Sequence, residues 1–133
     1  MGKFDDHDSD GVRSLKRLNS DLSNYYNDRG RCYNITGDRD SALKDFDMSL
    51  QLNPNNVHAY LNRGQLLLQR AAFDKALSDF SKVIELSIDE GLVIDAYNYR
   101  SMAYEKSGDK DAAAADMKAA VELLQRQRRR DKP

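Results

Sequence analysis

The sequence predicts an all-α protein in which one pair of helices is repeated three times. Phe46 lies 34 residues before Phe80, and Phe80 lies 37 residues before Met117. The same two intervals separate three further sets of residues: Gly30, Gly64 and Ser101; Ala42, Ala76 and Ala113; and Leu52, Leu86 and Leu123. A period of about 34 residues is typical of stacked helix pairs, and no segment has the alternating pattern of a strand.

Composition favours one small domain and excludes several classes of function. The chain has 133 residues, and its charged residues, 32% of the total, nearly cancel to a net charge of −1. This balance gives no general attraction to nucleic acid or to an anionic membrane. Cys32 is the only cysteine, so an internal disulfide or a cysteine-based zinc site is not possible.

Residues 1–22 precede the first repeat as a polar, acidic tail and a short helix. We expect residues 1–11 to be disordered, because acidic side chains predominate there. Apolar residues at helical spacing predict a short helix over about 12–18. The run Asn19–Asp21 contains strong N-cap residues, so a new helix is expected to begin near Ser20 or Asp21.

The first repeat is expected over residues 23–56. Its first helix carries Gly30 and should end at Thr36-Gly37-Asp38, because glycine suits the position after a helix and aspartate caps the next one. The second helix carries Phe46 and should end at Asn53-Pro54, because proline cannot continue a helix.

The second repeat is expected over residues 57–90. Its turn, Arg70-Ala71-Ala72, lacks the glycine and aspartate of the first turn, and Ile88 stands where the first repeat has proline. Three extra residues then precede the third repeat. This insertion suggests a local change in the pitch of the superhelix.

The third repeat is expected over residues 94–127, with its turn at Ser107-Gly108-Asp109. The second helix of this repeat should continue into the arginine-rich run 126–130, and residues 128–133 form a basic C-terminal tail. This tail is interpreted as a solvated helix end whose cations favour the helix dipole. Pairing with the acidic N-terminal tail of a neighbouring molecule is an alternative.

The recurring positions resemble the tetratricopeptide repeat (TPR). Small residues let two helices approach closely, and a large side chain fills the gap beside them. The matching residues are Gly30, Tyr33, Ala42, Phe46, Ser49 and Pro54; Gly64, Leu67, Ala76, Phe80, Val83 and Ile88; and Ser101, Tyr104, Ala113, Met117, Ala120 and Gln125. The resemblance implies a right-handed α-α superhelix of three stacked helix-turn-helix repeats.

The last repeat lacks the polar helix that often follows such an array. Its outer face is therefore expected to be bare, with four candidates for exposure: Met117, Ala120, Val121 and Leu124. Terminal repeats need a cap. Either the arginine-rich extension or another chain is expected to provide it.

Arginine and aspartate also recur in register, at Arg29, Arg63 and Arg100 and at Asp45, Asp79 and Asp116. Each arginine immediately precedes the small residue of a first helix, and each aspartate precedes the large residue of a second helix. We expect these residues to pair within a repeat or across a junction. A partly buried, bidentate pair would fix the register of the two helices.

The resemblance implies that the first helices line a concave groove that binds a peptide segment of a partner. The positions that it carries over are Asn24, Asn27, Arg31, Asn34, His58, Leu61, Asn62, Gln65, Asp95, Asn98, Tyr99 and Met102, with Asp28, Ile35, Leu68, Gln69, Glu105 and Lys106 beside them. Amides among them can hydrogen-bond a peptide backbone as donor and acceptor. The alternative is an ordinary solvated helix surface.

The resemblance does not extend to the carboxylate clamp of Hsp70 and Hsp90 co-chaperones. That clamp needs Lys and Asn on the first helix, Asn on the next, and Lys and Arg on the third. Only Asn62 matches; the other four positions are Asn27, Arg31, Asp95 and Tyr99. Asp95 would repel a terminal carboxylate, so clamp-type binding is not expected.

No catalytic, metal or cofactor motif is present. His7 lies among acidic residues in a segment without preorganised geometry, and Cys32 is interpreted as a small core residue between Gly30 and Tyr33. Phosphate-binding loops, zinc-protease motifs and nucleophile elbows are absent. An enzyme is therefore not expected.

The most favoured function is a non-catalytic adaptor or scaffold that binds a protein or peptide partner, without nucleic acid or membrane. The alternatives are a self-assembling scaffold that uses the uncapped last repeat and a small TPR chaperone of secreted substrates. A cytoplasmic location is expected, because the sequence has neither a signal-peptide core nor a membrane-spanning stretch.

Overall fold

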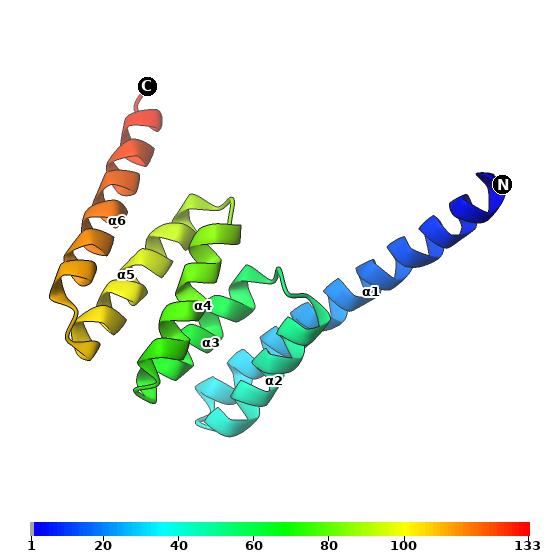
Figure 1. Ribbon diagram of the computed structural model, residues 1–133, viewed down its shortest axis with the longest axis horizontal. Coiled ribbons are helices and arrows are strands. Elements are labelled where there is room, and N and C mark those ends of the chain that lie inside the picture. The colour runs from blue at the N-terminus through cyan, green and yellow to red at the C-terminus, as the bar shows by residue number, and fades with distance from the viewer. Residues whose placement is uncertain (1) are drawn as a thin grey trace. The chain divides into compact units, whose positions relative to one another are not determined.

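A computed structural model describes the backbone of residues 2–133 and the side chains from residue 9 onward. The described residues form six helices, labelled in Figure 1, in chain order: α1 (Gly2–Ile35), α2 (Arg39–Leu52), α3 (Val57–Gln69), α4 (Phe73–Leu86), α5 (Glu90–Ser107) and α6 (Lys110–Arg130). No strand occurs in this described part of the chain, so the predicted all-α class is confirmed. The chain forms two compact units, one ending at Asn56 and one running from Val57 to Pro133.

The first helix of unit 1 is much longer than the sequence predicted. α1 is continuous over Gly2–Ile35, so the expected break at Asn19–Asp21 and the separate helix over 12–18 are wrong. The expected disorder of residues 1–11 is also wrong for residues 2–11, whose backbone is helical. The apolar pattern from Leu15 to Leu22 keeps helical spacing through the three capping-type residues, and this continuous period outweighs their local preference for a helix start.

Within unit 1, α1 packs on α2 through a glycine and a phenylalanine. A Cβ atom placed on Gly30 would lie 2.7 Å from the ring of Phe46, so a larger residue here would force the ring to move. Phe46 and Ala42 are buried beneath it. Close helix approach is therefore the physical reason for the small residue at this recurring position.

Unit 2 repeats this arrangement twice, with α3 on α4 and α5 on α6, and α4 also packs on α5. In the second repeat a Cβ atom on Gly64 would lie 2.6 Å from the ring of Phe80. In the third repeat Ser101 and Met117 occupy the same two positions, and the Ser101 hydroxyl donates to the carbonyl of Ala113 at 2.9 Å. A flexible methionine thus leaves room for the serine that a phenylalanine ring would exclude.

The three turns within the repeats share one backbone conformation. Gly37 and Gly108 have φ of 90° and 95°, and Ala71 occupies the matching position with φ of 60°. In each turn the residue with positive φ donates its N–H to the carbonyl three positions earlier, as Gly37 does to Asn34. The residue that follows donates its N–H to the carbonyl five positions before its own, as Asp38 does to Tyr33. The second repeat therefore keeps the turn geometry without glycine, at the steric expense of a Cβ atom in the left-handed region.

Aspartate caps the second helix of the first and third repeats. Asp38 accepts from the backbone N–H of Ser41 at 3.2 Å, and Asp109 accepts from that of Ala112 at 3.1 Å. Hydrogen bonds from Ser41 lower the pKa of Asp38, and the bond from the Ser41 hydroxyl contributes more than the bond from its N–H. In the second repeat Ala72 stands at the N-cap with φ −86° and ψ 70° and makes no side-chain cap bond.

Introducing the glycine and aspartate of the other two turns at Ala71 and Ala72 is expected to stabilise the protein. Ala72→Asp should raise the free energy of unfolding by about 1 kcal/mol through the new cap, because the backbone angles already match those at Asp38. Ala71→Gly should add a smaller gain by relieving the positive φ. Urea denaturation followed by circular dichroism measures both effects, and Ala115→Asp, on the exposed surface inside α6, is the control that should not stabilise.

The extra residues before the third repeat lengthen α5. Asp89 caps this helix by accepting from the N–H groups of Gly91 and Leu92, so α5 has 18 residues where α3 has 13. The arginine-rich run continues α6 to Arg130, as predicted. An ion pair between Arg130 and Glu90 joins these two extended helix ends.

Candidate functional site

Each repeat contains the predicted arginine–aspartate pair. The guanidinium of Arg100 donates to both carboxylate oxygens of Asp116, at 2.8 and 2.7 Å. Arg29 with Asp45 and Arg63 with Asp79 form the same two-pronged contact. The predicted pairing is therefore confirmed, and in all three repeats it joins the two helices of one repeat.

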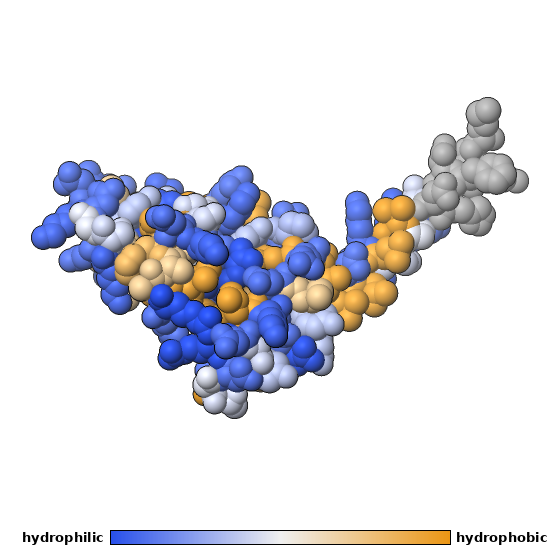
Figure 2. Space-filling view, turned by 60° about the horizontal axis from the view of Figure 1, so that its bottom comes forward, coloured by the Kyte–Doolittle hydropathy of each residue, from blue (hydrophilic) through white to orange (hydrophobic). Residues whose placement is uncertain are grey.

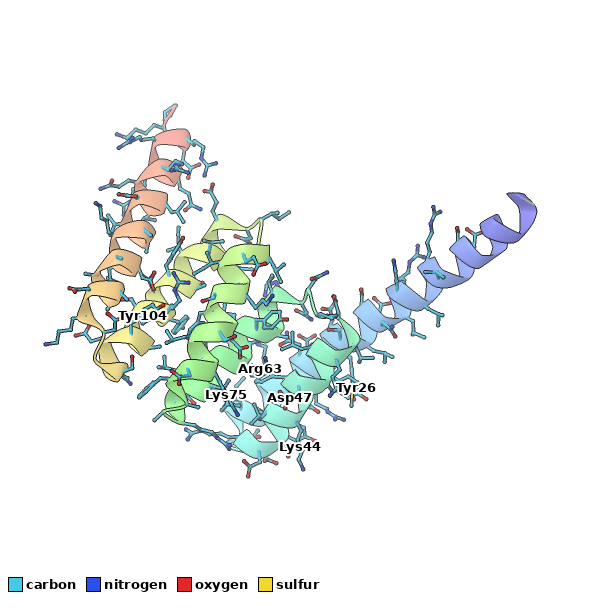
Figure 3. All side chains as sticks on the ribbon, viewed as in Figure 1. Tyr26, Lys44, Asp47, Arg63, Lys75 and Tyr104 are labelled. Atoms are coloured by element: carbon cyan, nitrogen blue, oxygen red, sulfur yellow. The ribbon has the colours of Figure 1, made fainter. Side chains whose placement is uncertain are left out.

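Tyrosine rings surround these arginines. Tyr26 lies beside Arg29 and Tyr104 beside Arg100, with ring centroids 5.3 and 5.9 Å from the guanidinium carbon; both rings are labelled in Figure 3, as is Arg63. Asp116, mainly through its hydrogen bond, raises the pKa of Arg100 above the ordinary arginine value. These two-pronged pairs join the two helices of each repeat and are therefore part of the scaffold.

The predicted groove positions of α3 and α5 meet in unit 2. Six of them line one hollow of about 210 Å³: Gln65, Leu68, Gln69, Tyr99, Met102 and Lys106. All six belong to the set that the sequence register placed on the first helices. The structure thus brings together side chains of α3 and α5 that lie at least 30 residues apart in the chain.

The hollow combines apolar, amide and cationic groups. Tyr99 stacks on Phe80 with ring centroids 5.6 Å apart, so its orientation is fixed by the core of the second repeat. Met102 is half-exposed and adaptable, while Gln65 and Gln69 offer amide donors and acceptors. Lys106 adds a positive charge to the rim of the hollow.

The other predicted positions of unit 2 differ in accessibility. His58 and Asp95 are exposed, Asn62 and Asn98 are half-buried, and Leu61 is buried. Leu61 therefore offers little surface to a partner. None of these five residues lines the hollow between α3 and α5.

In unit 1 the predicted positions lie along α1. Asn24 and Arg31 are exposed and Asn34 is half-buried, but Asn27 is only 5% exposed. The side-chain oxygen of Asn24 accepts from the amide of Asn56 at 3.2 Å. Asn24 and Asn27 therefore make contacts within unit 1 that reduce their availability to a partner. The sequence analysis did not predict these contacts.

A buried polar cluster in unit 1 explains this commitment. Ser23 and Ser49 are both fully buried, and the hydroxyl of each contacts the backbone carbonyl of the other, at 2.7 and 2.8 Å. The amide of Asn56 donates to the Ser23 hydroxyl at 2.9 Å. No sequence motif predicts this cluster, because its three residues are ordinary polar types and Ser23 lies 26 residues from Ser49 and 33 from Asn56.

The interpretation of Cys32 as a core residue is wrong, because its side chain is exposed. Successive helical residues are rotated by about 100°, so a residue two positions after Gly30 points to nearly the opposite side of the helix. Among the described residues no group of His, Cys, Asp and Glu side chains is arranged to hold a metal ion. The side chain of His7 lies outside the described residues.

The last helix has the partly bare face that the sequence predicted. Met117, Val121 and Leu124 are exposed, but Ala120 is buried, so the prediction is wrong for Ala120. A second hollow, of about 290 Å³, lies beside this face and is lined by Ser101, Glu105, Lys110, Ala113, Ala114 and Met117. Within residues 2–133, no helix has the length and apolar character needed to cross a membrane.

Comparison with known proteins gives a consistent result. The family model described as tetratricopeptide repeat matches residues 23–56, 57–87 and 94–123. Human tetratricopeptide repeat protein 13 is 29% identical over 104 residues, which cover 78% of this chain and 12% of that protein. The Drosophila melanogaster homolog of tetratricopeptide repeat protein 36 is 33% identical over 90 residues, covering 66% of this chain and 48% of that protein.

The chain therefore spans less than half the length of these two relatives. Among solved structures, the second TPR of Spaghetti (RPAP3) bound to the HSP90 peptide SRMEEVD is similar, with a TM-score of 0.79 and 18% identity. The match covers 86% of this chain and 96% of that one. At 18% sequence identity, this structural similarity supports the fold of the chain and no more.

Proposed function

The chain belongs to the tetratricopeptide repeat family, whose members are protein-interaction modules, and we propose that it binds a peptide segment of a partner between α3 and α5. The repeats supply a rigid frame on which first-helix side chains converge. The described residues contain no group of His, Cys, Asp and Glu side chains arranged to hold a metal ion. The proposal concerns where the peptide binds on this chain and which kind of peptide it is.

The observation that carries the proposal is the hollow of about 210 Å³ lined by six first-helix side chains. Ligand sites are typically concave and mostly apolar, with a few polar groups that fix orientation. Tyr99 and Met102 match the apolar part of this description, whereas Leu68 lines the hollow but is only 7% exposed. Gln65 and Gln69 match the polar part.

The composition of the hollow favours one class of ligand. An apolar side chain of the peptide would contact Tyr99 and Met102, and the neighbouring peptide backbone would hydrogen-bond the two glutamines. An acidic group next to that apolar residue would lie near Lys106. The proposed ligand is therefore an extended segment with an apolar residue beside an acidic one.

A ligand held by its terminal carboxylate is not proposed here. The resemblance places Asn27, Arg31, Asp95 and Tyr99 at four positions of the carboxylate clamp, where the clamp needs other residues. The exposed carboxylate of Asp95 would repel a terminal carboxylate. An internal segment of the partner fits better.

Selection from a displayed library of random peptides tests the proposal directly. Peptides enriched by the wild-type chain should contain an apolar residue next to an acidic one. Met102→Glu should weaken their binding at least tenfold, which is about 1.4 kcal/mol, because it buries a second negative charge against the ligand. Isothermal titration calorimetry with the selected peptides measures the change.

Ile88→Glu is the matched control, because Ile88 is fully exposed on unit 2 and does not line the hollow. The control should bind the peptides as the wild type does. Equal affinity of Met102→Glu and wild type would contradict binding in this hollow. Failure of the library to yield any peptide that the wild type retains would contradict peptide binding itself.

A further inference from the structure

Helix α6 has an open outer face in unit 2. Figure 1 shows α6 at the edge of this unit, where it packs on α5. Met117 and Val121 on the outer side are 48% and 47% exposed, and Ala114 and Lys118 beside them are exposed as well. Helical periodicity places these four residues on one side of α6, and we call them the α6 face. Exposed apolar side chains that lie together mark interaction sites.

Unit 2 itself shows what covers such a face, whereas unit 1 does not. Apolar side chains are also exposed on α1, where Figure 2 shows apolar surface next to the grey residues. Unit 1 contains a single repeat, so it has no second pair of helices with which this side of α1 can be compared. Unit 2 contains two repeats, and α4 of the second repeat corresponds to α6 of the third.

The face of α4 that corresponds to the α6 face is covered by helix α5. None of its four residues is exposed, and Phe80 is fully buried. Because α5 packs on α4, a first helix is what covers a second helix on this side. The register of the repeats pairs the residues of the two faces as follows: Leu77 with Ala114, Phe80 with Met117, Ser81 with Lys118, and Ile84 with Val121.

Two contacts define how α5 lies on α4. The ring of Tyr99 stacks on that of Phe80, with centroids 5.6 Å apart, and the guanidinium of Arg100 donates to the hydroxyl of Ser81 at 3.0 Å. Ala96 and Ala103 are fully buried and lie on the same side of α5 as Tyr99. The docking side of α5 is therefore an aromatic residue followed by arginine, between two small residues.

The hollow of about 290 Å³ beside α6 lies where such an aromatic ring would pack. In the second repeat Tyr99 stacks on Phe80 and lines a hollow together with Leu68. The equivalents of Phe80 and Leu68 in the third repeat are Met117 and Glu105, and both line the hollow beside α6. An aromatic side chain in a pocket is a common anchor of protein interfaces.

One charge distinguishes the α6 face from its counterpart on α4. Lys118 stands where α4 has Ser81. The Ser81 hydroxyl accepts a hydrogen bond from Arg100, whereas a lysine ammonium group has three donors and no acceptor. A carboxylate at the position of Arg100 would form a charge-assisted hydrogen bond with Lys118. Charge complementarity therefore favours an acidic residue where α5 has arginine.

This charge argues against a second copy of the chain as the occupant. All three first helices carry arginine at the position in question: Arg29, Arg63 and Arg100. A first helix of another copy, docked on α6 as α5 is docked on α4, would place its guanidinium against the ammonium group of Lys118. Like charges brought together in an interface are destabilising.

The arginine-rich end of α6 also leaves the α6 face open. Helix α4 ends at Leu86, and the chain then turns back into α5. At the corresponding residue, Leu123, α6 continues to Arg130. The arginines extend the same helix along its axis, so they do not fold over its side.

We propose that the α6 face binds a helix of a partner protein, in the way that α4 binds α5. The docking side of this helix carries an aromatic residue followed directly by an acidic one. Small residues lie three positions before the aromatic residue and four positions after it, as Ala96 and Ala103 do around Tyr99. The aromatic ring packs on Met117 in the hollow, and the acidic group pairs with Lys118.

Selection from a helical library tests the proposal. The library displays a three-helix scaffold in which the exposed positions of one helix are randomised. Scaffolds that the wild-type chain retains should carry the proposed pattern of small, aromatic, acidic and small residues. Failure to retain any scaffold, or retention of scaffolds without the acidic residue, would overturn the proposal.

A charge reversal at Lys118 provides the sharpest measurement. Lys118→Glu should weaken binding of the selected scaffolds about tenfold, because like charges then meet in the interface. Selection on Lys118→Glu itself should return lysine or arginine in place of the acidic residue. This exchange of preference reports a contact at residue 118, which a general loss of structure would not produce. Val121→Gln should weaken binding as well, by removing apolar contact area.

Two controls should bind the scaffolds as the wild type does. Lys75→Glu makes the same charge change at an exposed position of α4. Met102→Glu alters the hollow between α3 and α5, so its result separates this site from the function proposed above. Circular dichroism should show the same helical content for all variants.

Unchanged binding by both Lys118→Glu and Val121→Gln would show that the α6 face is not the docking site and would overturn the proposal. Sedimentation velocity tests the remaining occupant, a second copy. Self-association of the wild-type chain that Val121→Gln abolishes would assign the face to a second copy and would likewise overturn the proposal.

Discussion

Replacing Phe80 by alanine is expected to lower the free energy of unfolding by about 3–5 kcal/mol. The Phe80 side chain is fully buried, closes over Gly64 and stacks on Tyr99 of the next repeat. Its removal leaves a cavity and separates the second repeat from the third. Urea denaturation followed by circular dichroism measures the loss.

The third repeat provides a built-in test of this explanation. Gly64→Ser should destabilise the chain by about 1–3 kcal/mol, because the new side chain overlaps the ring of Phe80. Adding Phe80→Met should recover part of the loss, because Ser101 and Met117 coexist in the third repeat. Ile88→Ala, at a fully exposed position, should change little. Additive effects of Gly64→Ser and Phe80→Met would contradict the proposed steric coupling.

Replacing Asp116 by alanine is expected to cost about 2 kcal/mol of stability, because it leaves the part-buried guanidinium of Arg100 without its counter-charge. Arg100 also donates to the hydroxyl of Ser81 at 3.0 Å, so this one side chain connects α4, α5 and α6. Its loss should loosen both helix contacts of α5. Chemical denaturation again provides the measurement.

A double-mutant cycle separates the pair from its surroundings. Arg100→Met fills similar space without charge, and the double variant with Asp116→Ala should be more stable than the sum of the two single losses predicts. Glu122→Ala, an exposed carboxylate on the same helix, is the control for loss of charge alone. Strict additivity of the Arg100 and Asp116 effects would refute the coupling that the geometry indicates.

Local sequence patterns predicted the repeat well because they record local requirements. A residue with positive φ, a cap for the following helix and a small residue beneath a large one are each needed in every repeat, so they recur at fixed intervals. Where the sequence departs from these rules, at Ala71 and Ala72, the structure keeps the backbone angles of the neighbouring turns. Tertiary packing of the adjoining helices imposes the turn there.

The candidate site was predicted less completely. The register identified the six side chains that line the hollow in unit 2, because helical periodicity decides which face of a helix a residue occupies. It did not predict that Asn27 and Leu61 would be buried, or that Cys32 would be exposed. Burial depends on what packs against a face, and this information lies elsewhere in the chain.

By itself the sequence determined the all-α class, the three repeats, their turns and the arginine–aspartate pairs. All of these follow from the spacing of residues along one helix or from the recurrence of the same residue types at equivalent positions of three repeats. Only the tertiary structure decided the continuity of α1, the buried cluster of Ser23, Ser49 and Asn56, and the alignment of the hollow between α3 and α5. Those features depend on contacts between residues far apart in the chain, and the free energy of such contacts outweighs local capping preferences.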